Sequence, residues 1–203
     1  MNPHPAAIVI GRILAHLHGT FAVESASVTI FEPASERGNL GVDELQEQTV
    51  SLLNFQPVDN KVFNGQLAFN VLPEPEASTR TELRIMQQLD SILGKTFPKP
   101  ATAAVQVPVF NSHAFSMFVD VHASTEELAA HFTHNPAFAM AAAGSDPSPV
   151  TVVGSDRIHI QRLRSTGASP RHALWAVADS LRIAAANAIQ TAEHIMLAPA
   201  LET

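Results

Sequence analysis

Apolar residues recur at helical intervals in several stretches of the chain. Residues 5–18 are one example, because Ile10, Ile13, Leu14 and Leu17 share a helical face and Gly19 follows them. Two other stretches open with the pattern of a capping box, Thr79 with Glu82 and Ser124 with Glu127. The predicted helices are residues 5–18, Val42–Leu53, Thr79 to Gly94, Ser124 toward His131, and Leu181 to about Met196 with Asp179 or Ser180 as its cap.

Other stretches are rich in β-branched and aromatic residues and predict strands. They are Ser27–Phe31, Leu67–Leu72, Thr102–Phe110, His113–His122, Val150–Val153, Arg157–Arg164 and Leu174–Ala178. His113–His122 alternates cleanly, and we expect Phe115, Met117, Val119 and Val121 to supply an uncovered sheet face. Short links between neighbouring strands favour an α+β fold, a mixed and mainly antiparallel sheet with helices on one face.

Composition narrows the possible functions. The chain has 203 residues, 46% of them hydrophobic and 15% charged, which is typical of one large globular domain. A net charge of -7 argues against a nucleic-acid partner. No apolar run approaches the ~20 residues of a membrane span, and no signal peptide is visible, so a cytoplasmic protein with no membrane partner is expected. The cysteine count is zero, which excludes disulfides and thiol nucleophiles within the chain.

The motifs of common catalytic sites are missing. The glycines form neither G-x-G-x-x-G nor a P-loop. His131 and His134 are three residues apart on a predicted helix, but no third ligand has matching spacing, so no metal site is predicted. Ser112 and His113 are neighbours on a strand and face opposite ways, which argues against a Ser/His hydrolase. His113 lies at a strand rim, where a histidine is more often a structural hydrogen-bonding group than a base.

Four separated motifs together resemble the second domain of aspartate-semialdehyde dehydrogenases. They are VPVFNSH at 107–113, AFNVLP at 68–73, GVDEL at 41–45 and LWAVADSLR at 174–182. The resemblance runs from Asn2 to about Ile195. It implies a glyceraldehyde-3-phosphate-dehydrogenase-like C-terminal domain over residues 1–203 that forms a homodimer through its sheet face. It also implies that the final helix, 180–197, packs on an N-terminal NADP-binding Rossmann domain, which this chain does not contain.

The resemblance also carries a chemistry: thiolate attack on an aldehyde, hydride transfer to NADP, and release of the acyl group to phosphate. The family's Asn-Cys pair, which opens the first helix, falls on Asn2-Pro3, so that Pro3 takes the nucleophile's position and lacks a nucleophilic atom. The orienting glutamine falls on Glu32, and the substrate-carboxylate arginine falls on Gln106. The base is kept as His113.

Further positions on two predicted helices follow from the resemblance. Arg84, close to the acidic Glu82, replaces a lysine associated with the substrate or phosphate. The final helix keeps Asn187 as a weak candidate for cofactor contact, beside Gln190. No cofactor is expected in this chain, and NADP would bind only with an N-terminal Rossmann domain in the parent protein.

Two hypotheses remain open from the sequence. The first is a non-catalytic dimerisation domain, similar to the cysteine-less paralogues of the dehydrogenase that some bacteria carry. The second is an enzyme of altered chemistry, in which His113 and Glu32 perform acid–base work on a small carbonyl or anionic substrate.

Overall fold

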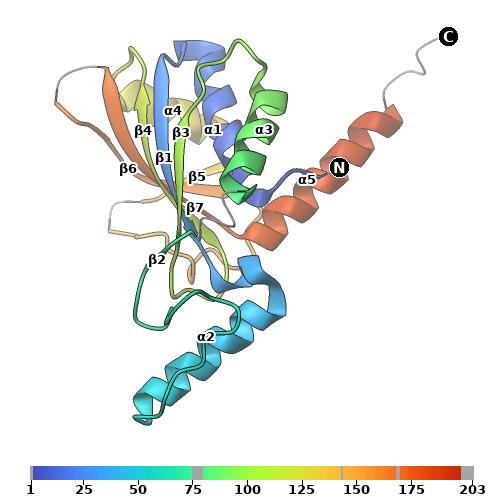
Figure 1. Cartoon of the computed structure of the whole chain (residues 1–203). Coiled ribbons are helices and arrows are strands. Elements are labelled where there is room, and N and C mark those ends of the chain that lie inside the picture. The colour runs from blue at the N-terminus through green and yellow to red at the C-terminus, as the bar shows by residue number, and fades with distance from the viewer. Residues whose placement is uncertain (1, 75–79, 143, 168–169, 198–203) are drawn as a thin grey trace.

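A seven-stranded mixed sheet forms the centre of the molecule (Figure 1). The structure is a computed structural model that describes residues 2–74, 80–142, 144–167 and 170–197. The strands are β1 Ser25–Glu32, β2 Leu72–Pro73, β3 Ala101–Gln106, β4 His113–Asp120, β5 Phe138–Met140, β6 Ile158–Ser165 and β7 Arg171–Ala178. Their order is β2-β3-β1-β4-β7-β6-β5, with β1–β3 and β5–β6 parallel and the other pairs antiparallel. The predicted α+β fold is confirmed.

Helices cover one face of this sheet (Figure 1). The helices are α1 Pro5–Phe21, the 3-10 helix η1 Ala34–Arg37, α2 Gly38–Leu53, α3 Arg80–Leu93, α4 Thr125–His134 and α5 Ser180–Leu197. Side chains of α1, α3 and α4 share one apolar core with the sheet. Helices α5 and α2 both start near the lower end of the sheet in Figure 1 and extend away from the body in different directions.

The alternation predicted for β4 is correct, but its two faces are exchanged. Phe115, Met117, Val119 and Val121, expected on an uncovered face, are buried beneath the helices. The more apolar side of a half-covered strand stabilises the fold most when it is buried. The uncovered face therefore carries the sparser set of residues, such as Ser116 and the partly exposed Phe118.

Helix α1 begins at residue 5, as the apolar pattern predicts, and ends later than predicted. Pro5 is its first residue and His4 is its N-cap, so Pro3 lies outside the helix that it was expected to open. At the other end, Gly19 does not stop the helix, which continues to Phe21 before Ala22 adopts a left-handed conformation with φ 51°. Proline fits the first helical turn because it has no N–H to leave unpaired.

Helix α2 and the segment 57–71 form an arm in which buried polar side chains of the helix, beside an apolar cluster, bind the backbone of the segment. The Glu44 carboxylate accepts hydrogen bonds from the backbone N–H groups of Lys61, Val62 and Phe63 at 2.7, 2.6 and 3.0 Å. Gln48 accepts from the N–H groups of Leu67 and Ala68. The strand predicted at Leu67–Leu72 is therefore wrong, because side chains of α2 rather than a neighbouring strand satisfy its first backbone groups, and only Leu72–Pro73 pairs in the sheet.

Several other predictions can be compared with the described residues. The capping box of Ser124 and Glu127 is confirmed, and Asp179 caps α5 by accepting from the N–H groups of Leu181 and Arg182. The strand predicted at Val150–Val153 is a turn with exposed Val150 and Val153. The strand predicted at Thr102–Phe110 ends at Gln106. The Thr79 half of the first capping box lies outside the described residues.

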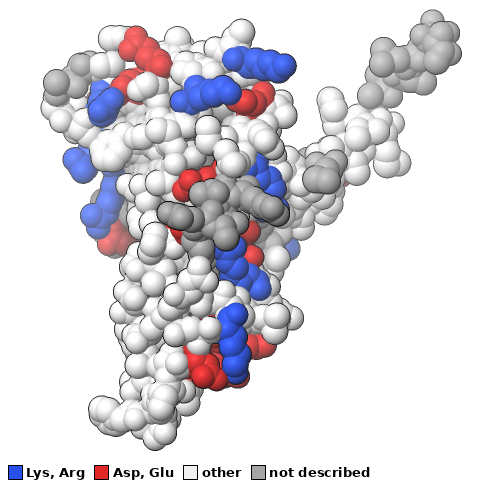
Figure 2. Space-filling model, in the orientation of Figure 1, with Lys and Arg blue, Asp and Glu red and all other residues white. Residues whose placement is uncertain are grey.

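Among the residues that the structure describes, the face drawn in Figure 2 shows no basic patch. On the face drawn in Figure 2, acidic and basic side chains are intermingled, and much of α5 and of the lower arm carries neither. None of the described helices combines the length and apolar character needed to cross a bilayer.

Candidate functional site: the His4–Glu36–His113 cluster

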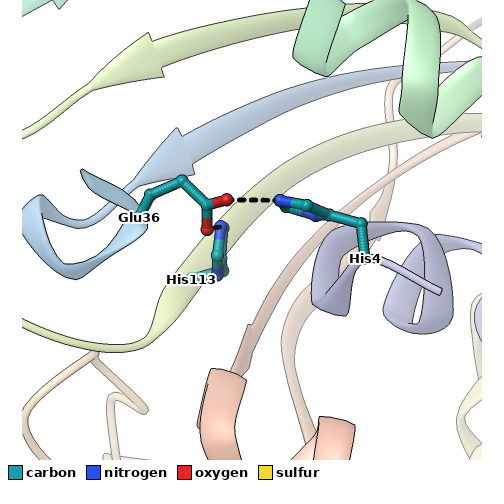
Figure 3. Close-up of side chains that lie close together, drawn as sticks. All are labelled: His4, Glu36 and His113. Carbon is teal, nitrogen blue, oxygen red and sulfur yellow. Dashed lines mark hydrogen bonds and ion pairs between the residues drawn. The ribbon is translucent and has the colours of Figure 1, made fainter. Parts of the chain in front are cut away.

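Three ionisable side chains from distant parts of the chain meet at one end of the sheet (Figure 3). His4 precedes α1, Glu36 lies in η1, and His113 opens β4. His4 Nε2 lies 2.6 Å from Glu36 Oε1, and His113 Nε2 lies 3.5 Å from Glu36 Oε2. The carboxylate therefore lies between the two imidazoles and faces each of them with a different oxygen.

His113 is fixed by the turn before it and by α5. Ser112 has φ 73°, a left-handed conformation that is rare outside glycine and turns the chain into β4. The His113 ring lies on the helix-covered side of the strand, and its Nδ1 is 2.6 Å from Ser180 Oγ. Its Nε2 has no hydrogen-bond partner within ordinary geometry. Burial lowers the pKa of His113 to about 4, so the ring is neutral at pH 7.

His4 is held by three hydrogen bonds, and the two that involve the ring nitrogens determine its tautomer. Its backbone N–H donates to Gln88 Oε1 of α3 at 2.8 Å, and its Nδ1 accepts from the N–H of Ala6 at 3.1 Å. A nitrogen that accepts cannot carry the proton of the neutral ring, so we assign that proton to Nε2. His4 Nε2–H then donates to Glu36, and the ring is only 5% exposed.

Glu36 is positioned by the VPVF segment. The N–H groups of Ala34 and Ser35 donate to the carbonyls of Val109 and Phe110 at 2.7 and 3.0 Å, which fixes the start of η1. Burial alone would raise the pKa of the Glu36 carboxyl, but the hydrogen bond from His4 and the nearby His113 and Arg84 hold that pKa below its usual range. The carboxylate is therefore ionised at pH 7. Arg84 Nη2 lies 4.0 Å from Oε1 at the exposed rim.

Glu32, predicted as the partner of His113, does not contact it within ion-pair distance. Among the described residues, Glu36 alone places a carboxylate oxygen within 4.0 Å of a His113 ring nitrogen. Glu32 is 1% exposed, and neither of its oxygens has a hydrogen-bond partner. Burial, together with nearby Glu74 and Glu36, raises the pKa of Glu32 to about 8, so it holds a proton at pH 7.

Gln106, expected to mark a lost arginine, is paired with a different arginine. It ends β3 beside Glu32 on β1 and is 3% exposed. With its amide oxygen turned toward Arg37, it accepts from Nε at 3.0 Å and from Nη2 at 2.5 Å. A guanidinium from η1 therefore lies against the residue that replaces the predicted arginine.

The remaining predicted residues lie elsewhere. Glu82 accepts from the N–H of Ala104 at 2.6 Å, which ties α3 to β3. Asn2 binds α5, donating to the carbonyl of Ala184 and accepting from Asn187 Nδ2 at 2.8 Å. Arg12 joins the same contact through Asn187 and Gln190. Pro3 and Asn187 line a surface hollow between α1, α3 and α5 rather than the histidine cluster.

Two of the central residues, His4 and Glu36, were not found from the sequence. His4 stands in the opening segment, but nothing in its spacing connects it with His113. Glu36 lies in the polar stretch 32–39, where no local pattern predicts a helix, and the short helix η1 forms there. The only available signal was the placement of His4 directly before a helix-compatible Pro5, which makes it an N-cap.

His4, Glu36 and His113 could also be considered as a metal centre, because one ligand atom of each lies within 4.8 Å of the others. The hydrogen bonding of His4 opposes this. A metal on Nε2 would move the ring proton to Nδ1, which already accepts from the N–H of Ala6. The two imidazoles of the cluster therefore suit a carboxylate between them better than a metal cation.

Comparison with known proteins finds a matching family model and related proteins. Residues 14–183 match the family described as "Semialdehyde dehydrogenase, dimerisation domain". The chain is 28% identical over 207 residues to the aspartate-semialdehyde dehydrogenase of Rickettsia conorii, covering 96% of this chain and 61% of that protein. It is 30% identical over 209 residues to a USG-1 protein homolog of Pseudomonas aeruginosa, with the same coverage.

Solved structures of similar proteins share the fold. The aspartate semialdehyde dehydrogenase II of Vibrio cholerae superposes with a TM-score of 0.88 at 27% identity, over 96% of this chain and 61% of the other. A probable aspartate-semialdehyde dehydrogenase of Pseudomonas aeruginosa gives 0.90 at 27% identity, over 97% and 62%. This chain therefore spans about three fifths of the length of the relatives it matches.

Proposed function

The chain belongs to the family of semialdehyde dehydrogenase dimerisation domains, and from that premise we propose that it serves as the dimerisation domain of a two-domain protein that performs no thiolate chemistry. The observation that carries the proposal is the start of α1. The resemblance puts the family's cysteine at the opening of the first helix, close to the base. Helix α1 opens with His4-Pro5, and the chain contains no cysteine. We therefore propose that Pro5, rather than Pro3, occupies the position of the family's nucleophilic cysteine.

Loss of the thiolate removes the covalent route. His113 can accept a proton, but an imidazole base without a nucleophile does not form an acyl-enzyme. Removal of a nucleophile typically costs several orders of magnitude in rate. Arg37 beside Gln106 supplies a guanidinium near the expected substrate anchor, yet it is already bound to that amide. The substrate-anchoring position is thus changed along with that of the nucleophile.

Two surfaces of the chain are suited to contact a second copy and an N-terminal domain. The sheet face opposite the helices has a shallow pocket whose lining includes Ser27, Ala101, Ser116 and Phe118. Phe31 and Trp175 lie on the same face, in a second apolar cluster. We assign this face to the homodimer. On α5, Ile189 and Ile195 are 60% and 68% exposed next to the hollow at Asn187. We assign this helix to an N-terminal domain, where NADP would bind; a cytoplasmic location stays a prediction.

The test is an activity measurement on the full-length parent protein. We expect no phosphate-dependent reduction of NADP by aspartate semialdehyde above the level of heat-treated protein, with the Vibrio cholerae enzyme as the positive control. Measurable turnover that depends on both phosphate and aldehyde would contradict the proposal.

The dimer is tested separately by light scattering on this chain. We expect a dimer at micromolar concentration, and we expect Phe118→Asp to give a folded monomer because a carboxylate cannot be buried unpaired in the interface. A matched change on an exposed side chain of the arm, Phe55→Asp, should leave the dimer intact. A monomeric state of the unsubstituted chain would contradict the assignment of the sheet face to the dimer.

A second candidate is an enzyme of altered chemistry that uses His113 as a base. This candidate requires the tautomer with the ring proton on Nδ1, donated to Ser180 Oγ, so that the neutral, buried ring has an unpartnered Nε2 that can accept a proton. The carboxylate opposite His113 would then be Glu36 and not Glu32. A thermal-shift screen of small carbonyl compounds tests this candidate, which requires a compound that stabilises the parent and not His113→Ala.

A further inference from the structure

We propose that His4, His113 and Arg84 form a carboxylate-binding site, and that Glu36 of the same chain occupies it. The proposal goes beyond the loss of a nucleophile. It says that the space between the opening of α1 and the retained base is filled from within, so that an external carboxylate binds there only when Glu36 is removed.

The contacts around Glu36 are those of a bound anion. Oε1 accepts from His4 Nε2–H at 2.6 Å, and Arg84 Nη2 lies 4.0 Å from the same oxygen. Oε2 faces His113 Nε2 at 3.5 Å. The Ser180 hydroxyl, 2.6 Å from His113 Nδ1, can donate to that nitrogen and so leave the ring proton on Nε2, toward the carboxylate.

The site is assembled by the fold independently of Glu36. His4 is fixed by its hydrogen bonds with Ala6 and Gln88, and His113 is fixed by Ser180 and by its place on β4. His113 is 1% exposed and its Nε2, which points into the cluster, has no hydrogen-bond partner. Removal of the Glu36 side chain would therefore leave two oriented imidazoles with an empty space between them.

The site is also reachable from solvent. The Glu36 side chain is 18% exposed and that of Arg84 is 54% exposed. A small anion can enter past Arg84 without opening the sheet. Cutting Glu36 back to its Cβ removes one methylene and the carboxylate, which together have the size of acetate.

The chemistry favours an anion over a metal ion. A cation on His4 Nε2 would displace the proton that Glu36 accepts and would break the capping bond from Ala6. It would also lie close to the Arg84 guanidinium, whose charge attracts anions and repels cations. Each of these features stabilises a carboxylate in the same place.

The experiment is thermal unfolding of Glu36→Ala in sodium acetate, compared with sodium chloride of equal ionic strength. We expect the variant to melt below the parent and acetate to raise its midpoint saturably by about 3–6 °C, since binding to the folded state alone stabilises it. Formate and propionate should give smaller rises because they underfill or overfill the space. The parent should not respond, because its own carboxylate occupies the site.

Two controls place the effect at this site. Glu36→Gln keeps the space filled and should not respond to acetate, and the double variant Glu36→Ala/His113→Ala should lose the response. If Glu36→Ala does not fold, Glu36→Ser provides the same test with a smaller loss of side-chain packing.

Three outcomes would overturn the proposal. The first is no acetate effect on a folded Glu36→Ala or Glu36→Ser. The second is an equal effect on the parent or the double variant, which would show non-specific stabilisation. The third is stoichiometric stabilisation of the parent by Zn²⁺ that His113→Ala abolishes, which would make the cluster a metal centre. None of these outcomes depends on the activity assay of the full-length parent, so failure of one proposal can be told from failure of the other.

Discussion

Two buried glutamates, one in the arm and one at the site, have opposite surroundings. Glu44 accepts from three backbone N–H groups and from Gln48, so its charge is fully compensated. Glu32 is equally buried, has no hydrogen-bond partner and lies near Glu74 and Glu36. In the arm, the Glu44 carboxylate holds the segment 57–71 through hydrogen bonds. At the end of the sheet, the Glu32 carboxyl group is buried without a hydrogen bond.

The two glutamates should therefore contribute differently to the stability of the fold. A buried carboxylate with several N–H donors stabilises its surroundings, and an unpaired one costs stability. Polar groups that a fold keeps at such a cost are found mostly where binding or chemistry occurs. Glu32 lies at the same end of the sheet as His113 and Glu36, where the candidate functional site is found.

The largest expected effect comes from Glu44→Gln. An amide turns an NH₂ group toward backbone donors that the carboxylate accepted, so the free energy of unfolding should fall by about 2–4 kcal/mol in urea denaturation. The exposed Glu47→Gln on the same helix should stay within about 0.5 kcal/mol of the parent. Equal effects of the two substitutions would contradict a structural role for the Glu44 carboxylate.

The same substitution at Glu32 should have the opposite sign. Its pKa is about 8 in the folded state, above the unfolded value, so its stabilising contribution is complete below pH ~4.5 and is lost as pH rises toward 8. Glu32→Gln keeps the neutral shape at every pH and should stabilise the protein by about 1–2 kcal/mol at pH 9, with little effect at pH 4.5. A loss of stability at pH 9 would contradict this prediction.

His113→Gln should flatten the acid side of the stability profile. The pKa of His113 is about 4 in the fold, below its unfolded value, so its contribution is complete above pH ~6.5 and is lost as pH falls toward 4. Between pH 7 and pH 4.5 the parent should lose about 1 kcal/mol more than the variant, measured by urea denaturation at each pH. Parallel profiles would mean that the pKa of His113 is the same in the folded and unfolded states, which would contradict the prediction.

The smallest expected effect is that of Ser180→Ala. It removes the hydroxyl from His113 Nδ1 and should lower the free energy of unfolding by about 0.5–1.5 kcal/mol at pH 7. Ser91→Ala, which removes an exposed hydroxyl on α3, is the matched control and should change it by less than about 0.5 kcal/mol. A change at Ser180 no larger than this control would remove Ser180 from the site.

Local patterns predicted the elements well where the sequence itself contains the cause. The apolar face of α1, the alternation of β4 and the capping box of Ser124 and Glu127 are all properties of neighbouring residues. The Leu67–Leu72 stretch shows where this fails. Its apolar residues pack on α2 and its N–H groups bond to the distant Gln48 side chain, which no local pattern reports.

The site was predicted only in part, for the same reason. His113 was found through its motif, but the partner chosen for it, Glu32, shares the end of the sheet with it without an ion-pair contact. Glu36 and His4 reach His113 across separations of 77 and 109 residues, the differences between 113 and 36 and between 113 and 4. Such contacts depend on the tertiary fold, and so does the choice of which β4 face the helices cover.

The central claim is that a carboxylate of this chain lies where an external one would bind, held by a proton on His4 Nε2. Long-range ¹H–¹⁵N NMR of the histidine rings at pH 7 tests it most directly. We expect His4 to be protonated on Nε2 with a bare Nδ1, and its Nε2–H resonance to move in Glu36→Ala and to return with acetate. A His4 ring protonated on Nδ1, or an Nε2–H resonance unchanged by Glu36→Ala, would contradict the account.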